Sequence, residues 1–290
     1  MSAPHQKLHR SFGAKLFNTD LRAIKPNAIV EFLELMDKYA VCAVPHKVPL
    51  TNEEHINFSK MIGPIERSAK KIAGTGKRLP YEEIIDQSNL GPKGNIYKDG
   101  DRRLAFKRAN RLWHTDMSFY QIRATFSLLS AHIVPPEGGN TEFIDMRTVY
   151  HDLPEAMKKR LVNVSAEHCY WHSRTLGGGP PPSSDEKASR PPAIHPLVIE
   201  NKRTGRKSLY LASHIRSIQD MEEKQGAQLL KELNEFATQK KYILSYQWSV
   251  GDVLIWDNLA TMHRATPFPD QKYVRDMRRT TCRECVLCRI

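Results

Sequence analysis

The chain has 290 residues, of which 40% are hydrophobic, and its formal net charge at pH 7 is +12. This length suits one large domain or two small ones, and the composition is typical of a globular protein with a sizeable core. No apolar run is long enough to span a bilayer, and the first residues lack the apolar segment of a secretory signal. We therefore expect a protein of the reducing cytoplasm.

The basic residues form several separate groups and not one continuous stripe. Most of these groups lie between residues 70 and 111, immediately before the stretch Leu112-Trp113-His114-Thr115-Asp116. This arrangement favours a positively charged entrance to a site for a small organic anion over a nucleic-acid track, and we find no RNA-binding motif. We expect a small-molecule partner, with neither a membrane nor a nucleic acid involved.

Three of the five cysteines, Cys282, Cys285 and Cys288, follow a CxxCxxC spacing near the end of the chain. A zinc or iron–sulfur site would require a fourth ligand, and the sequence offers none at a suitable spacing. We interpret the cluster as reduced thiols that are open to oxidation.

In chain order, the first elements are two helices, at residues 26–39 and about 51–61, with a short strand at 40–44 between them. The first helix has apolar residues at helical spacing, and the second opens with a capping box at Thr51-Asn52-Glu53-Glu54. Residues 66–110 are rich in Lys, Arg, Gly, Pro and Asn, with one short strand-like piece near 81–86. We interpret them as an irregular lid over a site.

From residue 124 onward, most of the predicted elements are strands. They are expected at 124–134, 140–145, 164–171, 197–200, 207–212, 242–248, 252–256 and 273–282, with helical segments at 146–162, divided by Pro154, and 221–239. A Gly/Pro/Ser-rich surface loop is expected at 173–193. The pattern predicts a mainly β fold, a sandwich or barrel with flanking helices, in one domain over residues 1–290.

The stretch from Leu112 to Asp116 places an imidazole and a carboxylate two residues apart. In an extended strand, His114 and Asp116 would point to the same face and could hold one metal ion. Such an ion requires a third ligand. His168 and His172 form an HxxxH pair, but a strand would separate them and no acidic residue is close.

His263 is the better third ligand, because it follows the strand-like residues 251–258 and precedes an arginine-rich strand with Arg275 and Arg279. Two imidazoles and one carboxylate form the facial triad of non-haem Fe(II) oxygenases, which leaves coordination positions open. A chelating 2-oxo acid would suit the remaining positive charge. Its free carboxylate would favour a bidentate arginine.

These residues resemble the taurine/2,4-dichlorophenoxyacetate dioxygenase (TauD/TfdA) family, and most closely its phenoxyalkanoate branch. The resemblance implies a double-stranded β-helix (jelly-roll, cupin-like) core. It also implies an enzyme that uses Fe(II), 2-oxoglutarate and O2 to oxidise an unactivated C–H of a small, anionic substrate, while 2-oxoglutarate becomes succinate and CO2. The motifs that carry it cover nearly the whole chain: FSKMIGPIE (58–66), ANRLWHTDMSF (109–119), GGNTEFIDMR (138–147), HPLV (195–198), GRKSLYLASH (205–214), GDVLIWDN (251–258), and residues 263–281.

The resemblance also implies roles for single residues. His114, Asp116 and His263 match the iron ligands. Thr141 and Arg275 match the residues that bind the distal carboxylate of 2-oxoglutarate. Arg279 matches an arginine close to both the co-substrate and the substrate's anionic group. The chain is one residue longer than expected before Arg275, so Arg278 or Arg279 stays an alternative for its role, although strand alternation favours Arg275.

The substrate side departs from the family. Where the phenoxyacetate enzyme has a lysine after a DG turn, this chain has Asn95, so we do not transfer the herbicide substrate. The substrate candidates are Lys71, Lys93, Asn95, Trp113, Phe119 and Arg279; the two aromatics are equally well explained as core residues. Two alternatives remain open, a hydroxylase of nucleic acid or protein and a non-catalytic iron- and anion-binding member. A homo-oligomer is also open.

Overall fold

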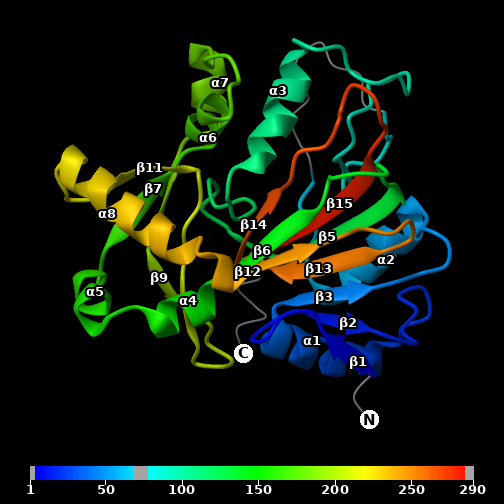
Figure 1. The fold of residues 1–290 in the computed structure, drawn as a ribbon, viewed down its shortest axis with the longest axis horizontal. Helices are drawn as coiled ribbons and strands as arrows, with labels where there is room; N and C mark the ends of the chain where they lie inside the picture. Colours follow the sequence, from blue (N-terminus) through cyan, green and yellow to red (C-terminus); the bar gives the residue numbers. More distant parts are fainter. Residues whose placement is uncertain (1–3, 68–77, 285–290) are drawn as a thin grey trace.

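A computed structural model describes residues 4–67 and 78–284 (Figure 1). Its main feature is a seven-stranded sheet in the order β1-β2-β3-β13-β5-β15-β4, packed against a three-stranded sheet in the order β12-β6-β14. The bounds of these strands are β1 His5–Lys7, β2 Ala14–Leu16, β3 Val41–Val44, β4 Ile85–Asp86, β5 Ala124–Ile133, β6 Thr141–Asp145, β12 Ile243–Tyr246, β13 Val253–Asp257, β14 Thr261–Ala265 and β15 Asp276–Arg283.

The space between the two sheets is filled by a hydrophobic core. Leu129, Met277 and Trp256 from the large sheet pack with Phe143 and Leu244 from the small one, and all five are buried. Removal of this apolar surface from water is the main favourable contribution to folding. The sheets therefore form the two layers expected of the predicted β core.

Helices α1 (Pro26–Tyr39) and α2 (Asn52–Ile62) cover the outer face of the large sheet, as Figure 1 shows. Both predicted helices are thus confirmed. The capping box is also present: the Thr51 hydroxyl accepts from the Glu54 N–H at 3.2 Å, and Glu54 accepts from the Thr51 N–H at 2.8 Å. These bonds satisfy N–H groups that a helix start would otherwise leave open.

A second cluster of apolar side chains lies on the side of β6 and β14 that carries α8 (Figure 1). As predicted, Pro154 divides the helical segment after β6, and the two halves are α4 and α5. The elements of this side are α4 Met146–Asp152, α5 Glu155–Arg160, β7 Ser165–His168, β8 Ala193–Pro196, β9 Val198–Glu200, β10 Lys207–Leu209, β11 Ile215–Ile218, α8 Glu223–Ala237 and the 3-10 helix η2 Lys240–Tyr242.

Three short helices, α3 (Arg102–Arg108), α6 (Tyr170–Leu176) and α7 (Ser184–Ser189), lie near one another at the upper edge of Figure 1. They correct two predictions, because neither the lid at 66–110 nor the loop at 173–193 is wholly irregular. The strand predicted at 164–171 also ends at His168. The helices are too short to show a clear 3.6-residue period, and tertiary packing of Phe106 against Trp171 stabilises them.

Five of the observed strands, β1, β2, β8, β11 and β14, were not predicted. β2 pairs with β3, so the start of the chain is part of the large sheet, and β11 pairs with β7. β14 carries His263, which the sequence analysis placed between two predicted strands and not on a strand of its own. Within the described ranges, no helix is long and apolar enough to cross a membrane.

Candidate active site

Backbone pairing brings His114 and His263 together. His263 lies on β14, and His114 follows the 3-10 helix η1 (Ala109–Arg111) as an isolated bridge to it, with N–H···O distances of 3.0 and 2.8 Å. The predicted strand does not continue to Asp116, which begins a turn in which Met117 has a φ of 58°. Asp116 is instead fixed by its own N–H, which donates to the Asn258 side chain at 3.3 Å.

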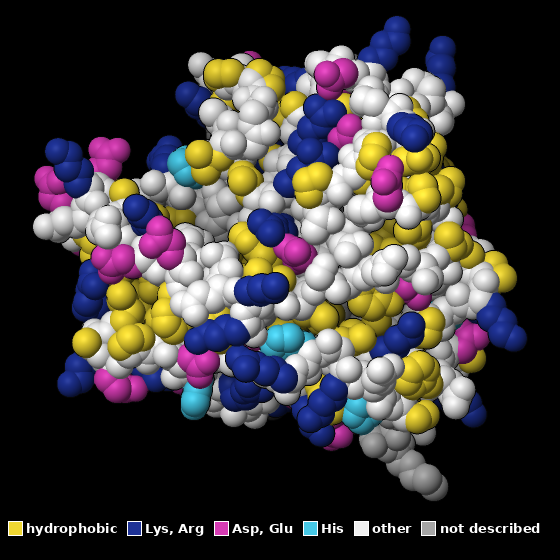
Figure 2. Space-filling view, viewed as in Figure 1, with side chains coloured by type: hydrophobic (Ala, Val, Ile, Leu, Met, Phe, Trp, Pro, Cys, Tyr) yellow, Lys and Arg dark blue, Asp and Glu magenta, His cyan; other side chains and the backbone are white. Residues whose placement is uncertain are grey.

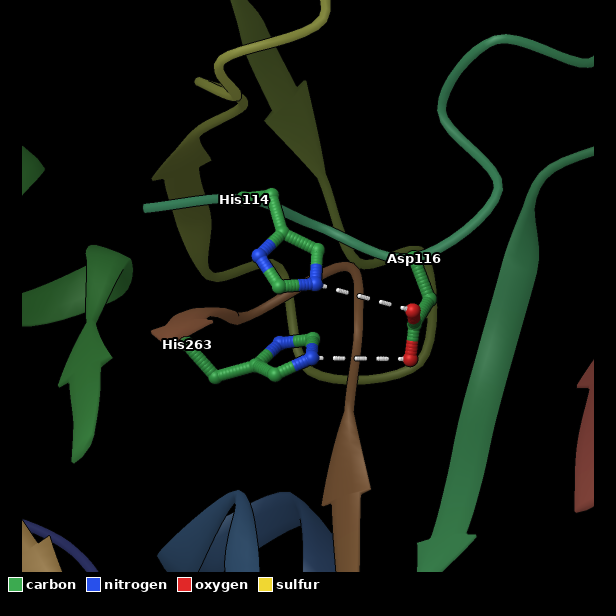
Figure 3. Close-up of side chains that lie close together, drawn as sticks. All are labelled: His114, Asp116 and His263. Atoms are coloured by element: carbon green, nitrogen blue, oxygen red, sulfur yellow. Dashed lines mark ion pairs between the residues drawn. The ribbon is translucent and has the colours of Figure 1, made fainter. Parts of the chain in front are cut away.

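The three predicted metal ligands form one buried cluster (Figure 3). The Asp116 carboxylate lies 3.9 Å from His114 Nε2 and 3.6 Å from His263 Nε2. One ligand atom from each residue can be chosen so that all three lie within 4.8 Å of one another. The exposed fractions of the three residues are 3%, 4% and 5%. Such a set could hold one divalent ion while leaving part of its coordination sphere open.

The protonation states favour a cation at this position. Burial lowers the pKa of His114 to about 4, against the attraction of Asp116, and it lowers the pKa of His263 well below the usual value. Burial alone would raise the pKa of Asp116, but the Arg279 guanidinium and the two imidazoles lower it to about 2. At neutral pH the cluster therefore presents two neutral imidazoles and one carboxylate, the forms that bind metal ions.

Contacts around the cluster orient its donor atoms. His114 Nδ1 lies 2.8 Å from the Leu112 carbonyl, which fixes the proton on Nδ1 and leaves the Nε2 lone pair directed toward Asp116. Ser127 donates to one Asp116 oxygen at 2.8 Å, and Arg279 donates to the other. The donor set and its orientation thus fit a bound Fe(II) ion.

A small cavity of about 90 Å³ adjoins the two imidazoles, and Thr141 and Arg275 line it. The Thr141 hydroxyl accepts from Trp248 Nε1 at 3.0 Å, so its own proton can be donated to a ligand. Arg275 is 8% exposed, and burial lowers its pKa to about 10, which leaves the guanidinium charged at neutral pH. This cavity offers a cation and a hydroxyl donor to a carboxylate.

The structure also separates the three arginines of the RDMRR stretch. Arg275 lines the small cavity and donates through Nε to the Gly139 carbonyl at 3.3 Å. Arg279 lines it too, but its charge is taken up by Asp116. Arg278 bonds to Asn52 on α2 at 2.8 Å, outside both cavities.

A second, larger cavity of about 730 Å³ meets the small one at His114 and Arg279. Of the predicted substrate residues, Phe119 and Arg279 line it. Trp113 is partly buried against the second apolar cluster and lines neither cavity, and Lys93 and Asn95 lie on an exposed turn away from both cavities. Lys71 lies outside the described residues, as do Cys285 and Cys288, whereas Cys282 is a buried free thiol on β15.

Other residues at the cavities were missed by sequence reasoning. Arg174 and His214 line the large cavity, and Asn110 lines both. Asn89 organises the approach to β15, since its side chain accepts from the Arg275 N–H at 2.9 Å and donates to the Asp270 and Tyr273 carbonyls. Their positions depend on tertiary contacts between segments that no local pattern connects.

Comparison with known proteins places the chain in a family. Residues 4–281 match the model described as taurine catabolism dioxygenase TauD, TfdA family. The chain is 36% identical to an alpha-ketoglutarate-dependent 2,4-dichlorophenoxyacetate dioxygenase of Burkholderia sp. (strain RASC), over 97% of this chain and 94% of the relative. It is 30% identical to an (S)-phenoxypropionate/alpha-ketoglutarate-dioxygenase of Sphingobium herbicidovorans, over 90% of this chain and 88% of the relative.

The fold agrees with this result. The crystal structure of AAD-2 in complex with Mn(II) and N-oxalylglycine superposes with a TM-score of 0.93 and 36% identity, over 98% of this chain and 99% of that one. The chain therefore belongs to the TauD/TfdA family. The predictions of a jelly-roll core and of an Fe(II)- and 2-oxoglutarate-dependent dioxygenase that uses O2 are confirmed.

Proposed function

We propose that this dioxygenase oxidises a small aryl or alkyl carboxylate in the large cavity, with its co-substrate in the small one. One observation carries the proposal: the buried His114, Asp116 and His263 cluster lies where the two cavities meet. A metal ion held there would face both. The co-substrate and the substrate would thus approach one ion from different sides.

Each residue has a distinct part in this proposal. His114, Asp116 and His263 hold Fe(II), which when bound supplies the oxidising chemistry with O2. Arg275 and Thr141 bind the distal carboxylate of 2-oxoglutarate, the first by charge and the second by its hydroxyl proton. The Arg279 guanidinium donates to Asp116 and holds the Asp116 carboxylate in place.

The substrate class rests on the lining of the large cavity and on the relatives. Phe119, Tyr120 and Tyr170 supply an aromatic wall, with ring centroids 4.8 and 4.9 Å apart. The relatives named above are called dioxygenases of phenoxyacetate and phenoxypropionate compounds, both aryl ether acids. An aryl acid would bury its ring against this wall.

The test is substrate-dependent succinate formation. The purified protein with Fe(II), 2-oxoglutarate and O2 would be given phenoxyacetates, phenoxypropionates, alkyl sulfates and sulfonates, and succinate would be measured against a no-substrate control. We expect stimulation by at least one aryl carboxylate. If every compound gave only the control rate, the proposed function would be wrong and a non-catalytic role would gain support.

A hydroxylase of nucleic acid is the alternative that the positive charge raises. In the view of Figure 2, Lys and Arg side chains form separate groups interrupted by acidic and hydrophobic ones. Many of the arginines are also neutralised by carboxylates, as Arg78 is by Asp86 and Asp276. A gel shift with random DNA at several salt concentrations would reveal a nucleic-acid partner, and we expect none.

We also propose a single catalytic domain in the cytoplasm. β1 and β15 belong to the same sheet, so the beginning and the end of the described chain share one core. Cys42, Cys169 and Cys282 are free and buried, which fits a reducing compartment. Sedimentation of the purified protein would show whether it forms a homo-oligomer.

A further inference from the structure

Three arginines are buried in the described part of the chain, and they differ in how their charge is balanced. Arg147 pairs with Asp145 at 2.7 Å. Arg174 and Arg275 are 7% and 8% exposed, and neither has a carboxylate within 4.0 Å among the described residues. A buried charge without a counter-ion is costly, so an anionic ligand is the expected partner. Arg275 has one in the proposed function, and Arg174 does not.

The contacts of Arg174 hold its guanidinium in place without neutralising it. Its Nη1 donates to the Phe106 carbonyl at 2.7 Å and to the Asn110 side chain at 3.1 Å, and its Nε donates to the Ser173 hydroxyl at 3.3 Å. All three acceptors are uncharged. They tie α6 to α3 and η1 and fix the plane of the guanidinium, so its ordering is complete before a ligand arrives.

Arg174 lines the large cavity close to the metal cluster. Asp116 and Arg279 both influence its pKa, which burial lowers, and the guanidinium in turn influences His114. It lies over the Tyr170 ring at 5.1 Å, and Tyr170 contacts Phe119. A cation, an aromatic wall and the metal cluster are thus close together in one cavity.

The other cations of this cavity are worse placed to bind an anion. Arg190 lies 4.3 Å from the Tyr170 ring centroid but is half-buried and in contact with solvent. Most of the rest are paired within the protein: Arg67 with Glu83, Arg78 with Asp86 and Asp276, Arg103 with Asp101, Arg279 with Asp116 and Arg283 with Glu66. Lys107 donates to the Asp86 carbonyl at 2.6 Å.

We propose that Arg174 binds the carboxylate of the primary substrate. This inference rests on the proposed function and adds the residue that selects an acid. Each cavity then has one buried guanidinium without a counter-ion, Arg275 for the co-substrate and Arg174 for the substrate. The substrate's ring would pack against Phe119 and Tyr170, with its carboxylate on the α6 side of the cavity.

The test compares binding of an acid with that of its uncharged amide. Protein loaded with Mn(II) and N-oxalylglycine would be titrated calorimetrically with 2,4-dichlorophenoxyacetate, hexanoate and their primary amides. We expect the wild type to prefer at least one acid over its amide by tenfold or more. Arg174→Gln should reduce this preference to less than threefold while changing N-oxalylglycine affinity less than twofold. Arg174→Lys keeps the positive charge but loses the planar set of guanidinium donors, so it should retain part of the preference for the acid over its amide.

Arg190→Gln is the matched control, because it removes a cation beside the same ring, and its acid preference should change less than twofold. Thermal unfolding would show whether Arg174→Gln is folded, and Arg174→Lys carries the test if it is not. The inference would be overturned if Arg174→Gln kept the preference for the acid, or if only Arg279→Gln lost it. It would also be overturned if the wild type showed no such preference for either acid. Failure of the proposed function would appear differently, as acid preference without succinate formation by the Fe(II) protein.

Discussion

The two cavities that meet at His114 are built from different parts of the molecule. The small cavity takes six of its 19 lining residues from core strands, among them Leu129 on β5, Thr141 on β6 and His263 on β14, and the others from α3, η1 and connecting segments. The large cavity, about 730 Å³ against about 90 Å³, is lined mainly by segments between strands, with α3 and α6 among them. Strand register therefore fixes the part of the small cavity that carries Thr141 and His263, whereas the large cavity depends mostly on how connecting segments pack.

This difference separates the reaction from the choice of substrate. A one-residue shift in β14 would turn His263 away from the metal cluster, so register constrains the small cavity strongly. Segments between strands accept substitutions and insertions more readily, and binding specificity commonly lies there. We therefore expect relatives with the same cluster to differ in the substrates they admit.

The largest expected effect is that of His114→Ala. Loss of a ligand should lower the affinity for Mn(II) or Fe(II) by more than about 100-fold, since even residues that only orient ligands contribute 10- to 100-fold. Turnover of 2-oxoglutarate should fall to background. Metal titration and succinate release would measure both. His172→Ala removes a histidine of the HxxxH pair outside the cluster and should keep turnover; a fully active His114→Ala would disprove the ligand assignment.

Next in size is Arg275→Gln, which tests the small cavity alone. Loss of a buried charge partner should weaken 2-oxoglutarate binding about 100-fold, roughly 3 kcal/mol, with metal affinity nearly unchanged. The KM for 2-oxoglutarate and the Mn(II) affinity are the readouts. Arg278→Gln, on the opposite face of the strand, is the matched variant and should leave the KM within threefold. Equal loss of metal and co-substrate in Arg275→Gln would indicate misfolding instead.

The sequence predicted the residues of the metal cluster and the small cavity better than those of the large cavity. The candidates for the metal cluster and the co-substrate cavity, such as His263, Thr141 and Arg275, lie on or beside predicted strands, and the structure brings them together. Residues of the large cavity were predicted poorly. Lys93 and Asn95 lie on an exposed turn, whereas Arg174 and His214 were not considered.

The physical reason lies in what a local pattern can encode. The alternation expected of the predicted strand agrees with the cavity lining, since Arg275 and Arg279 line the small cavity and Arg278 does not, although β15 begins only at Asp276. The direction of Arg174 depends on Phe106 and Asn110, which lie more than 60 residues away. Asp116 lies in the predicted cluster, but the sequence argument for its direction was wrong, since a turn and Asn258 orient it and not a strand.

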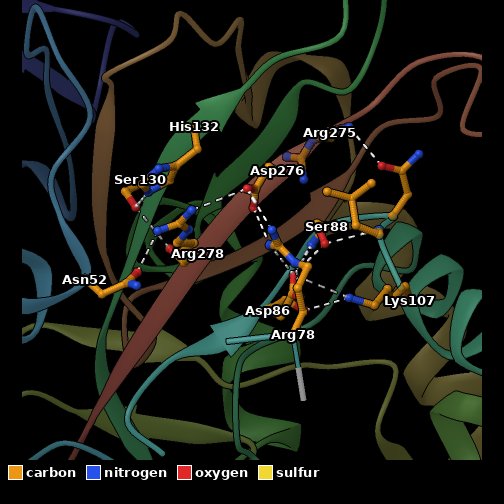
Figure 4. Close-up of polar contacts among 12 residues, drawn as sticks. Asn52, Arg78, Asp86, Ser88, Lys107, Ser130, His132, Arg275, Asp276 and Arg278 are labelled. Carbon is orange, nitrogen blue, oxygen red and sulfur yellow. Dashed lines mark hydrogen bonds and ion pairs between the residues drawn. The ribbon is translucent and has the colours of Figure 1, made fainter. Parts of the chain in front are cut away.

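The smallest expected effect concerns the contact of Arg78 with Asp86 and Asp276. Arg78, in the wall of the large cavity, donates to Asp86 at 2.8 Å and to Asp276 on β15 at 2.6 Å (Figure 4). Arg78→Met would leave Asp276, which is 4% exposed, without this partner. The free energy of unfolding should fall by about 2 kcal/mol, as for other buried carboxylates that lose a partner. Urea denaturation would measure it.

Arg67→Met provides the matched control for this last comparison. Arg67 also lines the large cavity, but its side chain is 67% exposed and its contact to Glu83 is 3.4 Å long. An exposed pair of this kind contributes little, so its loss should cost at most about 0.5 kcal/mol. If both variants lost the same stability, the Arg78 pairs would contribute no more than a surface contact. If only Arg78→Met also raised the KM for 2-oxoglutarate, the wall of the large cavity would help to position Arg275 through its neighbour Asp276.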